Sequence, residues 1–194
     1  MSTAESSTKW VDVQNDGSLD GFARTNNLDP NSLRSLKEGV VILPMNTFFE
    51  GESSFNLFPK PSKDILLSLR EKGLQTTLYE DGREKRNLIL KSEDIVLPIL
   101  LFVGQAALQL GLSILANLIS DRLLRRKEKP PAESRVRVQY AQIDQKSTIV
   151  RWRRIDGPSK DVARMLMEEA QVLAGQGLTK NARTQSSRKQ RKVR

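Results

Sequence analysis

One segment constrains the fold more than any other, because residues 95–120 contain no charged side chain over 26 positions. A helix that crosses a bilayer needs about 20 predominantly apolar residues, so the length of this segment permits one membrane span. The segment also has a polar residue at every fourth position. On a helix, residues with this spacing form one slowly rotating strip. The strip consists of Gln105, Gln109, Ser113 and Asn117.

The polar strip separates two interpretations of the segment. Lipid offers amide side chains no hydrogen-bond partners, whereas a helix packed on protein can turn the strip toward water or toward a partner. We therefore predict a long apolar helix over residues 95–126, buried in the protein core or in an interface with a partner protein or a second copy. A cytoplasmic location goes with this prediction. The alternative is a single-span membrane anchor with a basic cytoplasmic module.

Positive charge is concentrated in the last two fifths of the chain. Residues 1–120 contain 12 basic and 15 acidic residues (net −3), whereas residues 121–194 contain 20 basic and 8 acidic residues (net +12). Basic segments of this kind suit the phosphates of nucleic acid or an anionic membrane surface. Nucleic-acid binding is therefore a second alternative. The candidate anion-binding residues are Arg135, Arg137, Arg151, Arg153, Arg154, Arg188, Lys189, Arg191, Lys192 and Arg194.

Before the uncharged segment, the pattern predicts an α/β (α+β) fold. Residues 1–27 are polar and aperiodic, and we expect them to be disordered. Residues 28–126 are predicted to form an α/β region in which short β-hairpins pack on the long apolar helix. Its elements are a helix capped by Asp29, a buried strand at 40–43, an irregular loop at 48–61, a helix at 63–72 and a hairpin at 74–91 that turns at Asp81 and Gly82.

After a predicted linker at 127–134, residues 135–177 alternate and then become helical, which predicts a strand–strand–helix module. On a two-residue period Arg151 and Arg153 share one face of the second strand, and we expect Arg135 or Arg137 to join them. Trp152 is expected to point the other way, into the core. Residues 178–194 are predicted to be a disordered basic tail.

Composition also restricts the chemistry. The chain has no cysteine and no histidine. Thiol and imidazole nucleophiles and the usual nitrogen- or sulfur-ligated metal sites are therefore excluded. We predict no catalytic residue, no cofactor and no metal site, and expect a non-enzymatic protein.

From residue 95 onward, the layout resembles small accessory proteins found alongside the effectors of bacterial conflict and defence systems. The shared layout is an apolar helix rich in Gly, Ala and Leu that ends in arginines, followed by two strands and a terminal helix. The resemblance covers residues 95–173 and rests on the order of elements. It implies a non-catalytic adaptor of a partner effector, and it assigns no active-site residue.

Overall fold

The computed structural model describes residues 8–13, 17–36, 38–46, 55–88, 95–120, 135–143 and 150–190. In residues 176–190 it describes the backbone only. Within these ranges the chain forms a mixed α/β fold, as expected from the sequence.

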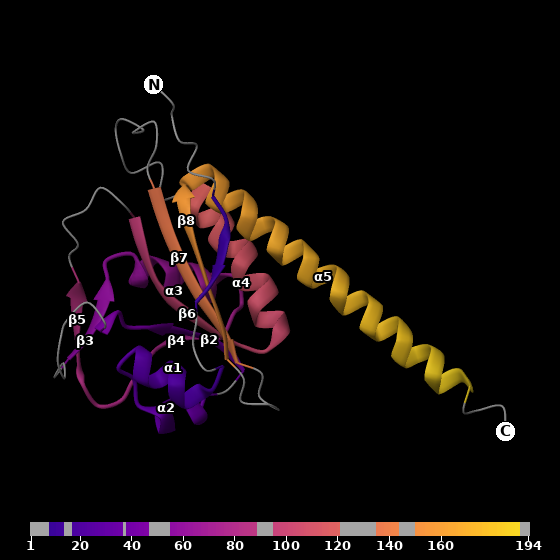
Figure 1. Ribbon diagram of the computed structural model, residues 1–194, viewed down its shortest axis with the longest axis horizontal. Helices are drawn as coiled ribbons and strands as arrows, with labels where there is room; N and C mark the ends of the chain where they lie inside the picture. The colour runs from indigo at the N-terminus through magenta and orange to yellow at the C-terminus, as the bar shows by residue number, and fades with distance from the viewer. Residues whose placement is uncertain are drawn as a thin grey trace.

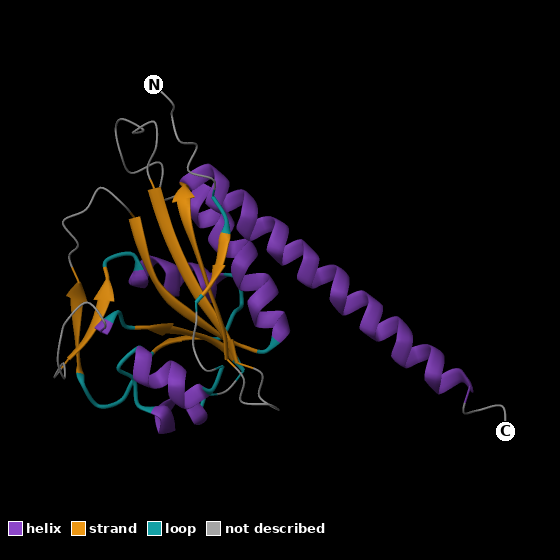
Figure 2. Ribbon diagram, in the orientation of Figure 1, coloured by secondary structure: helices purple, strands orange, loops and turns teal. Residues whose placement is uncertain are grey.

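The centre of the fold is a mixed six-stranded sheet (Figures 1 and 2). Neighbouring strands are antiparallel except for two parallel pairs, β6 with β7 and β2 with β4. A separate parallel pair of strands, β3 (Phe55–Pro59) and β5 (Glu84–Leu88), lies beside the main sheet. In spatial order, the strands of the main sheet are β1 (Trp10–Asp12), β8 (Val150–Pro158), β7 (Arg135–Ile143), β6 (Ile95–Val103), β2 (Gly39–Leu43) and β4 (Thr76–Leu78).

Helices cover both faces of this sheet. On one face, α4 (Gln105–Leu118) and α5 (Ser159–Gln190) lie side by side, and α3 (Ser62–Glu71) packs beside α4. On the other face lie α1 (Leu19–Thr25) and α2 (Pro30–Arg34). The ring of Phe22 in α1 meets the ring of Trp152 edge-on, with centroids 5.3 Å apart.

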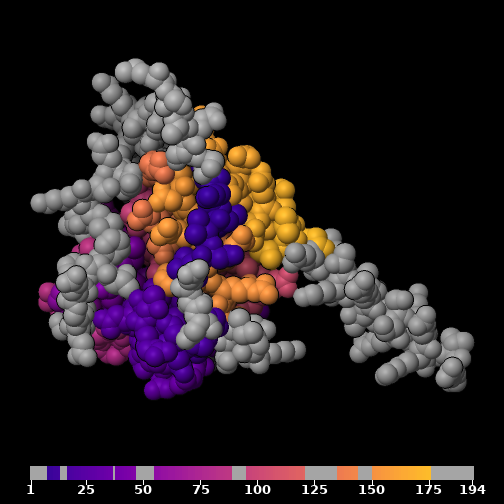
Figure 3. All heavy atoms as spheres, in the orientation of Figure 1, coloured from indigo at the N-terminus to yellow at the C-terminus, as the bar shows by residue number. Residues whose placement is uncertain are grey.

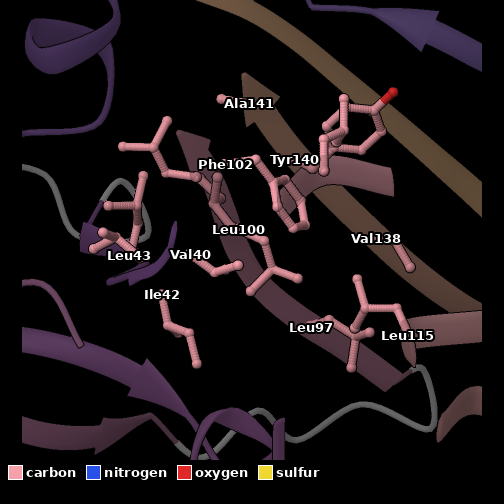
Figure 4. Close-up of a cluster of buried hydrophobic side chains, with 14 of the residues drawn as sticks. Val40, Ile42, Leu43, Leu97, Leu100, Phe102, Leu115, Val138, Tyr140 and Ala141 are labelled. Carbon is pink, nitrogen blue, oxygen red and sulfur yellow. The ribbon is translucent and has the colours of Figure 1, made fainter. Parts of the chain in front are cut away.

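The neighbouring strands β6 and β2 lie in the core (Figure 4). Every residue of β2 is buried, and every residue of β6 after Ile95 is buried. Leu100 and Phe102 of β6 have no exposed surface, and they lie among side chains from β2, β7 and α4. Strands covered on both faces read as continuous apolar runs, and this explains the composition of the segment.

The prediction of one long helix over residues 95–126 is wrong. Residues 95–103 form β6, and only the residues after Gly104 are helical. Pro98 disfavours a helix interior, and the register between β6 and β7 shifts between Val96 and Ile99, where this proline lies. Gly104 has a φ of 96°, which lets the chain turn directly from strand to helix.

The same finding bears on the membrane alternative. Among the helices that the structure describes, none combines the length and the apolar character that a transmembrane span requires. The segment proposed for the span is instead divided between a central strand and a helix of the α/β body.

The predicted hairpin at 74–91 is also wrong, although both strands form. β4 pairs with β2 and β5 pairs with β3, in both cases in parallel. The amide of Tyr79 donates to the carbonyl of Ile42 at 2.9 Å, so the chain continues along β2 and does not fold back. The predicted irregular loop at 48–61 contains β3.

Of the remaining predicted segments, two are contradicted by the structure and several are confirmed. The disordered lead-in is contradicted by β1 and α1, and α1 buries Leu19 and Phe22. The disordered tail is contradicted by α5, whose backbone continues to Gln190. The predicted linker lies outside the described residues. The helix capped by Asp29, the buried strand at 40–43, the helix at 63–72 and the C-terminal strand–strand–helix order are confirmed.

Candidate anion-binding surface

The five arginines of β7 and β8 divide between two faces of the sheet. Arg137 lies opposite Asp156, and Arg153 lies opposite Tyr140. Cross-strand partners project from the same face, so Arg135, Arg137 and Arg154 lie on one face and Arg151 and Arg153 on the other. The prediction that Arg135 or Arg137 joins Arg151 and Arg153 is therefore wrong.

Arg153 is held inside a network that connects three elements. Its Nη1 donates to Glu169 Oε1 of α5 at 2.6 Å, and its Nε donates to Asp12 Oδ1 of β1 at 3.1 Å. The guanidinium also lies 4.9 Å from the centroid of the Trp10 ring, within cation–π range. Figure 3 shows the β1 atoms (indigo) lying against the orange strands, with α5 (yellow) alongside. Arg153 thus connects β8 with β1 and α5.

Tyr140 completes this network. Its hydroxyl donates to Glu169 Oε1 at 3.4 Å and accepts from Arg153 Nη1 at 3.4 Å. Burial raises the pKa of Tyr140 to about 12, against the opposing effect of the Arg153 hydrogen bond. Tyr140 therefore stays protonated at neutral pH, and the network positions secondary structure.

On the opposite face, the carboxylate of Asp156 accepts hydrogen bonds from two of the arginines. Its Oδ2 accepts from Arg137 Nε at 2.8 Å, and its Oδ1 accepts from Arg135 Nη2 at 3.4 Å. An anion approaching this face would compete with the Asp156 carboxylate for both guanidinium groups.

Arg151 and Arg154 are the two exposed arginines of β8. Within the described part of the chain, neither guanidinium group forms a hydrogen bond or an ion pair. Arg151 also lines a groove of about 450 Å³ at the end of β1, together with Asp12, Val13 and Val150. Of the five strand arginines, these two are the most available to an external anion.

Trp152, between these arginines, is buried as expected, with 8% of its surface exposed. Its indole ring packs against Phe22 in the core. Among the residues that the structure describes, the indole Nε1 finds no hydrogen-bond partner. Trp152 thus contributes to packing beneath the surface, and the exposed charge comes from its neighbours.

The polar strip of α4 faces α5 at one end and solvent at the other. Gln105 Nε2 donates to the carbonyl of Leu173 in α5 at 3.5 Å, and Ser113 Oγ donates to the Gln109 carbonyl at 3.3 Å. Asn117 is exposed. The beginning of the strip therefore lies against a helix of the same chain.

The contact between Gln105 and Leu173 also marks where α5 leaves the body. Gln105 is the first residue of α4, so α4 does not extend alongside the later part of α5. The α5 backbone nevertheless continues to Gln190, away from the sheet (Figure 1). Arg188 and Lys189 lie on this backbone, whereas Arg191, Lys192 and Arg194 lie outside the described residues. Residues 170–194 contain seven basic residues and no acidic residue.

A second polar cluster, which the sequence did not reveal, joins β3 to the body. Asn56 Nδ2 donates to Asp81 Oδ1 at 2.8 Å, and Asn46 Nδ2 donates to Asn56 Oδ1 at 3.0 Å. Arg83 Nε donates to Asp81 Oδ2 at 2.8 Å. Burial alone would raise the pKa of Asp81, but the hydrogen bonds from Arg83 and Asn56 lower it below its ordinary value. These groups bind one another, so the cluster has a structural role.

The described residues contain no group of three or more carboxylates placed to hold a metal ion. In comparisons with known proteins, no family model, curated protein or solved structure matches this chain.

Proposed function

We propose that this protein is a non-catalytic binding protein whose basic C-terminal helix contacts nucleic acid. The observation that carries the proposal is the path of α5, which leaves the body after Leu173 and continues as helical backbone to Gln190. The sequence there has seven basic residues and no acidic residue over residues 170–194. A polyanion is the partner that this charge suits, because each phosphate that is neutralised releases counterions.

Two further properties support a partner at this position. A helical segment of about 15 residues is marginally stable in water by itself, so binding to a partner would stabilise the part of α5 whose backbone leads away from the sheet. The exposed guanidinium groups of Arg151 and Arg154 add positive charge to the same half of the sequence. The sequence predicts a protein partner at 95–126 because the uncharged segment needs apolar surroundings. The body of the same chain supplies much of these surroundings, because β6 is enclosed in the sheet and α4 packs on α5.

The proposal is tested by measuring the affinity of the full-length protein for a short labelled DNA duplex over a range of salt concentrations. If all seven basic residues contact phosphates, the slope of log K against log salt should approach about −6. A full-length variant with seven Gln substitutions removes the charge and keeps the chain length. The substituted residues are Lys180, Arg183, Arg188, Lys189, Arg191, Lys192 and Arg194.

A charge control comes from exposed lysines of the body, Lys60, Lys63 and Lys72, each changed to Gln. We expect the tail variant to lose most of the affinity and most of the salt dependence, and the body control to retain both. A salt-independent affinity, or equal affinities for the tail variant and the unchanged protein, would overturn the proposal.

A further inference from the structure

The outer edge of β4 is an unpaired sheet edge within the described residues. β4 is the last strand of the main sheet and pairs only with β2. The amide of Val40 donates to the Gln75 carbonyl, and the amide of Tyr79 donates to the Ile42 carbonyl. Because backbone groups alternate in direction along a strand, the polar groups of Thr76 and Leu78 point away from β2. Arg70 Nε donates to the outward carbonyl of Thr76 at 2.8 Å.

The side chains of β4 itself do little to prevent pairing, although the strand is three residues long and Arg70 of α3 covers one of its outward carbonyls. Charged side chains, prolines and bulges protect natural edge strands, but β4 consists of two threonines and a leucine. β5, in contrast, exposes Glu84, Lys85 and Arg86. The difference indicates that the β5 edge is protected by its own side chains, whereas the outward amides of β4 and the Leu78 carbonyl can pair with another strand.

Two helices border the open edge and leave a groove along it. The groove has a volume of about 390 Å³. Leu36, just after α2, and Leu66 of α3 contribute apolar walls, together with Leu78 of β4. Next to Leu66, Leu67 of α3 is 45% exposed. A strand added to β4 would cover apolar surface on both sides of the sheet.

We propose that a second copy of this chain occupies the groove, with the two β4 strands antiparallel about a two-fold axis at Thr77. In this register Thr76 of each copy lies opposite Leu78 of the other. The outward amides and carbonyls then form four interchain hydrogen bonds, and a carbonyl that already accepts from Arg70 has a second lone pair for this bond. The two main sheets become one continuous sheet.

Charge complementarity favours a second copy over an unrelated strand. The two-fold axis places Glu80 of one copy opposite Leu74 of the other, at the end of β4 where Arg70 is bound. Glu80 has a side chain that is 73% exposed, and its present partner is Lys85. The Glu80–Lys85 pair thus lies at one end of the edge and Arg70 at the other, and antiparallel pairing brings each Glu80 toward the Arg70 of the other copy.

The symmetry axis provides a direct test because the chain has no cysteine. Two Thr77 residues would form a pair without mutual hydrogen bonds, with Cα atoms about 4.5 Å apart, a spacing that permits a disulfide. The variant Thr77→Cys should therefore form a disulfide-linked dimer under mild oxidation. Lys60→Cys, at another exposed position, is the matched control and should remain mostly monomeric.

Sedimentation equilibrium of the unchanged protein should show a reversible dimer. Thr77→Lys should weaken this dimer by about tenfold, because like charges then meet across the axis. Thr77 is exposed, so the substitution should leave the thermal unfolding of the body unchanged. A monomer at all concentrations, or equal cross-linking of the two cysteine variants, would overturn the inference.

The inference does not depend on nucleic-acid binding. The tail variant with seven Gln substitutions should dimerise like the unchanged protein, and Thr77→Lys should keep the salt-dependent affinity of a single copy. Failure of one proposal can thus be distinguished from failure of the other.

Discussion

The Arg153 guanidinium and the Glu169 carboxylate lie 2.6 Å apart and fasten α5 to β8. Both side chains are mostly buried, with 27% and 22% of their surfaces exposed. Charged groups in such surroundings interact more strongly than they do in bulk water, and each is costly to leave without its partner. The pair therefore attaches the first part of α5 to the sheet, and we propose that the later part of the same helix binds nucleic acid.

Replacing Arg153 by Met should destabilise the fold by about 1 to 2 kcal/mol, because Glu169 and Tyr140 lose their cationic partner. Chemical denaturation gives the free energy of unfolding. Arg34→Met is the matched control, because Arg34 and Asp20 form an ion pair with 52% and 53% exposure. The control should cost less than about 1 kcal/mol. If both variants lost the same free energy of unfolding, the Arg153 network would contribute no more to stability than an exposed ion pair.

Gly111→Ala should destabilise the protein by about 1 to 3 kcal/mol through overpacking. A Cβ atom at Gly111 would lie 2.3 Å from Cε1 of Phe102, a ring with no exposed surface. In Gly175→Ala, in α5, the added Cβ meets no described atom within 4 Å outside the local helix backbone, so this change should stabilise by about 0.5 to 1 kcal/mol through helix propensity. Thermal unfolding of both variants measures the contrast. A neutral Gly111→Ala variant would contradict close packing of α4 on β6.

Asn56→Ala should cost about 1 to 3 kcal/mol, since Asn46 Nδ2 and Asp81 Oδ1 each lose a hydrogen bond in buried surroundings. Urea unfolding measures the loss. Asn31→Ala provides the comparison, because Asn31 is exposed and its side-chain oxygen accepts from the exposed Arg34 at 3.1 Å. That change should stay below about 0.5 kcal/mol. If both variants unfold at the same urea concentration, the cluster does not hold β3 to the body.

The two tyrosines of the chain should both ionise above the ordinary tyrosine pKa, since burial raises the pKa of Tyr79 and raises that of Tyr140 to about 12. An unfolded tyrosine ionises near pH 10, so the unfolded chain loses protons first as the pH rises. The contribution of Tyr140 to stability is therefore complete below about pH 10 and is lost as the pH approaches about 12. Ultraviolet absorbance of tyrosinate follows both groups, and Tyr140→Phe assigns them. A normal titration of Tyr140 would contradict its burial.

Local patterns predicted much of this fold where neighbouring residues determine the structure. The Asp29 side chain accepts from the amides of Asn31 and Ser32. The start of α2 could therefore be predicted from a few neighbouring residues alone. The segment 95–120 differs because a strand buried on both faces has no alternation. Pro98 and Gly104 were the available signals of a break, since neither suits a helix interior.

Strand pairing and the arrangement of the candidate site depended on contacts between distant residues. The alternation at 74–91 located β4 and β5, but their partners are β2 and β3, which the local pattern does not specify. Similarly, the spacing of Arg151 and Arg153 placed them on one face, but only the register with β7 shows that Tyr140 lies beside Arg153. One sequence alone does not show which distant residues are paired in the folded sheet.

Pro98 has a consequence for the newly made chain. β6 lies between β2, which is synthesised earlier, and β7, which is synthesised later. Until β7 emerges, a nine-residue apolar strand has one flank available to other unfinished chains. A proline has no amide hydrogen to donate, so intermolecular ladders are interrupted at that position. We therefore expect Pro98, which lies at the register shift of the mature sheet, to disfavour aggregation of the nascent protein.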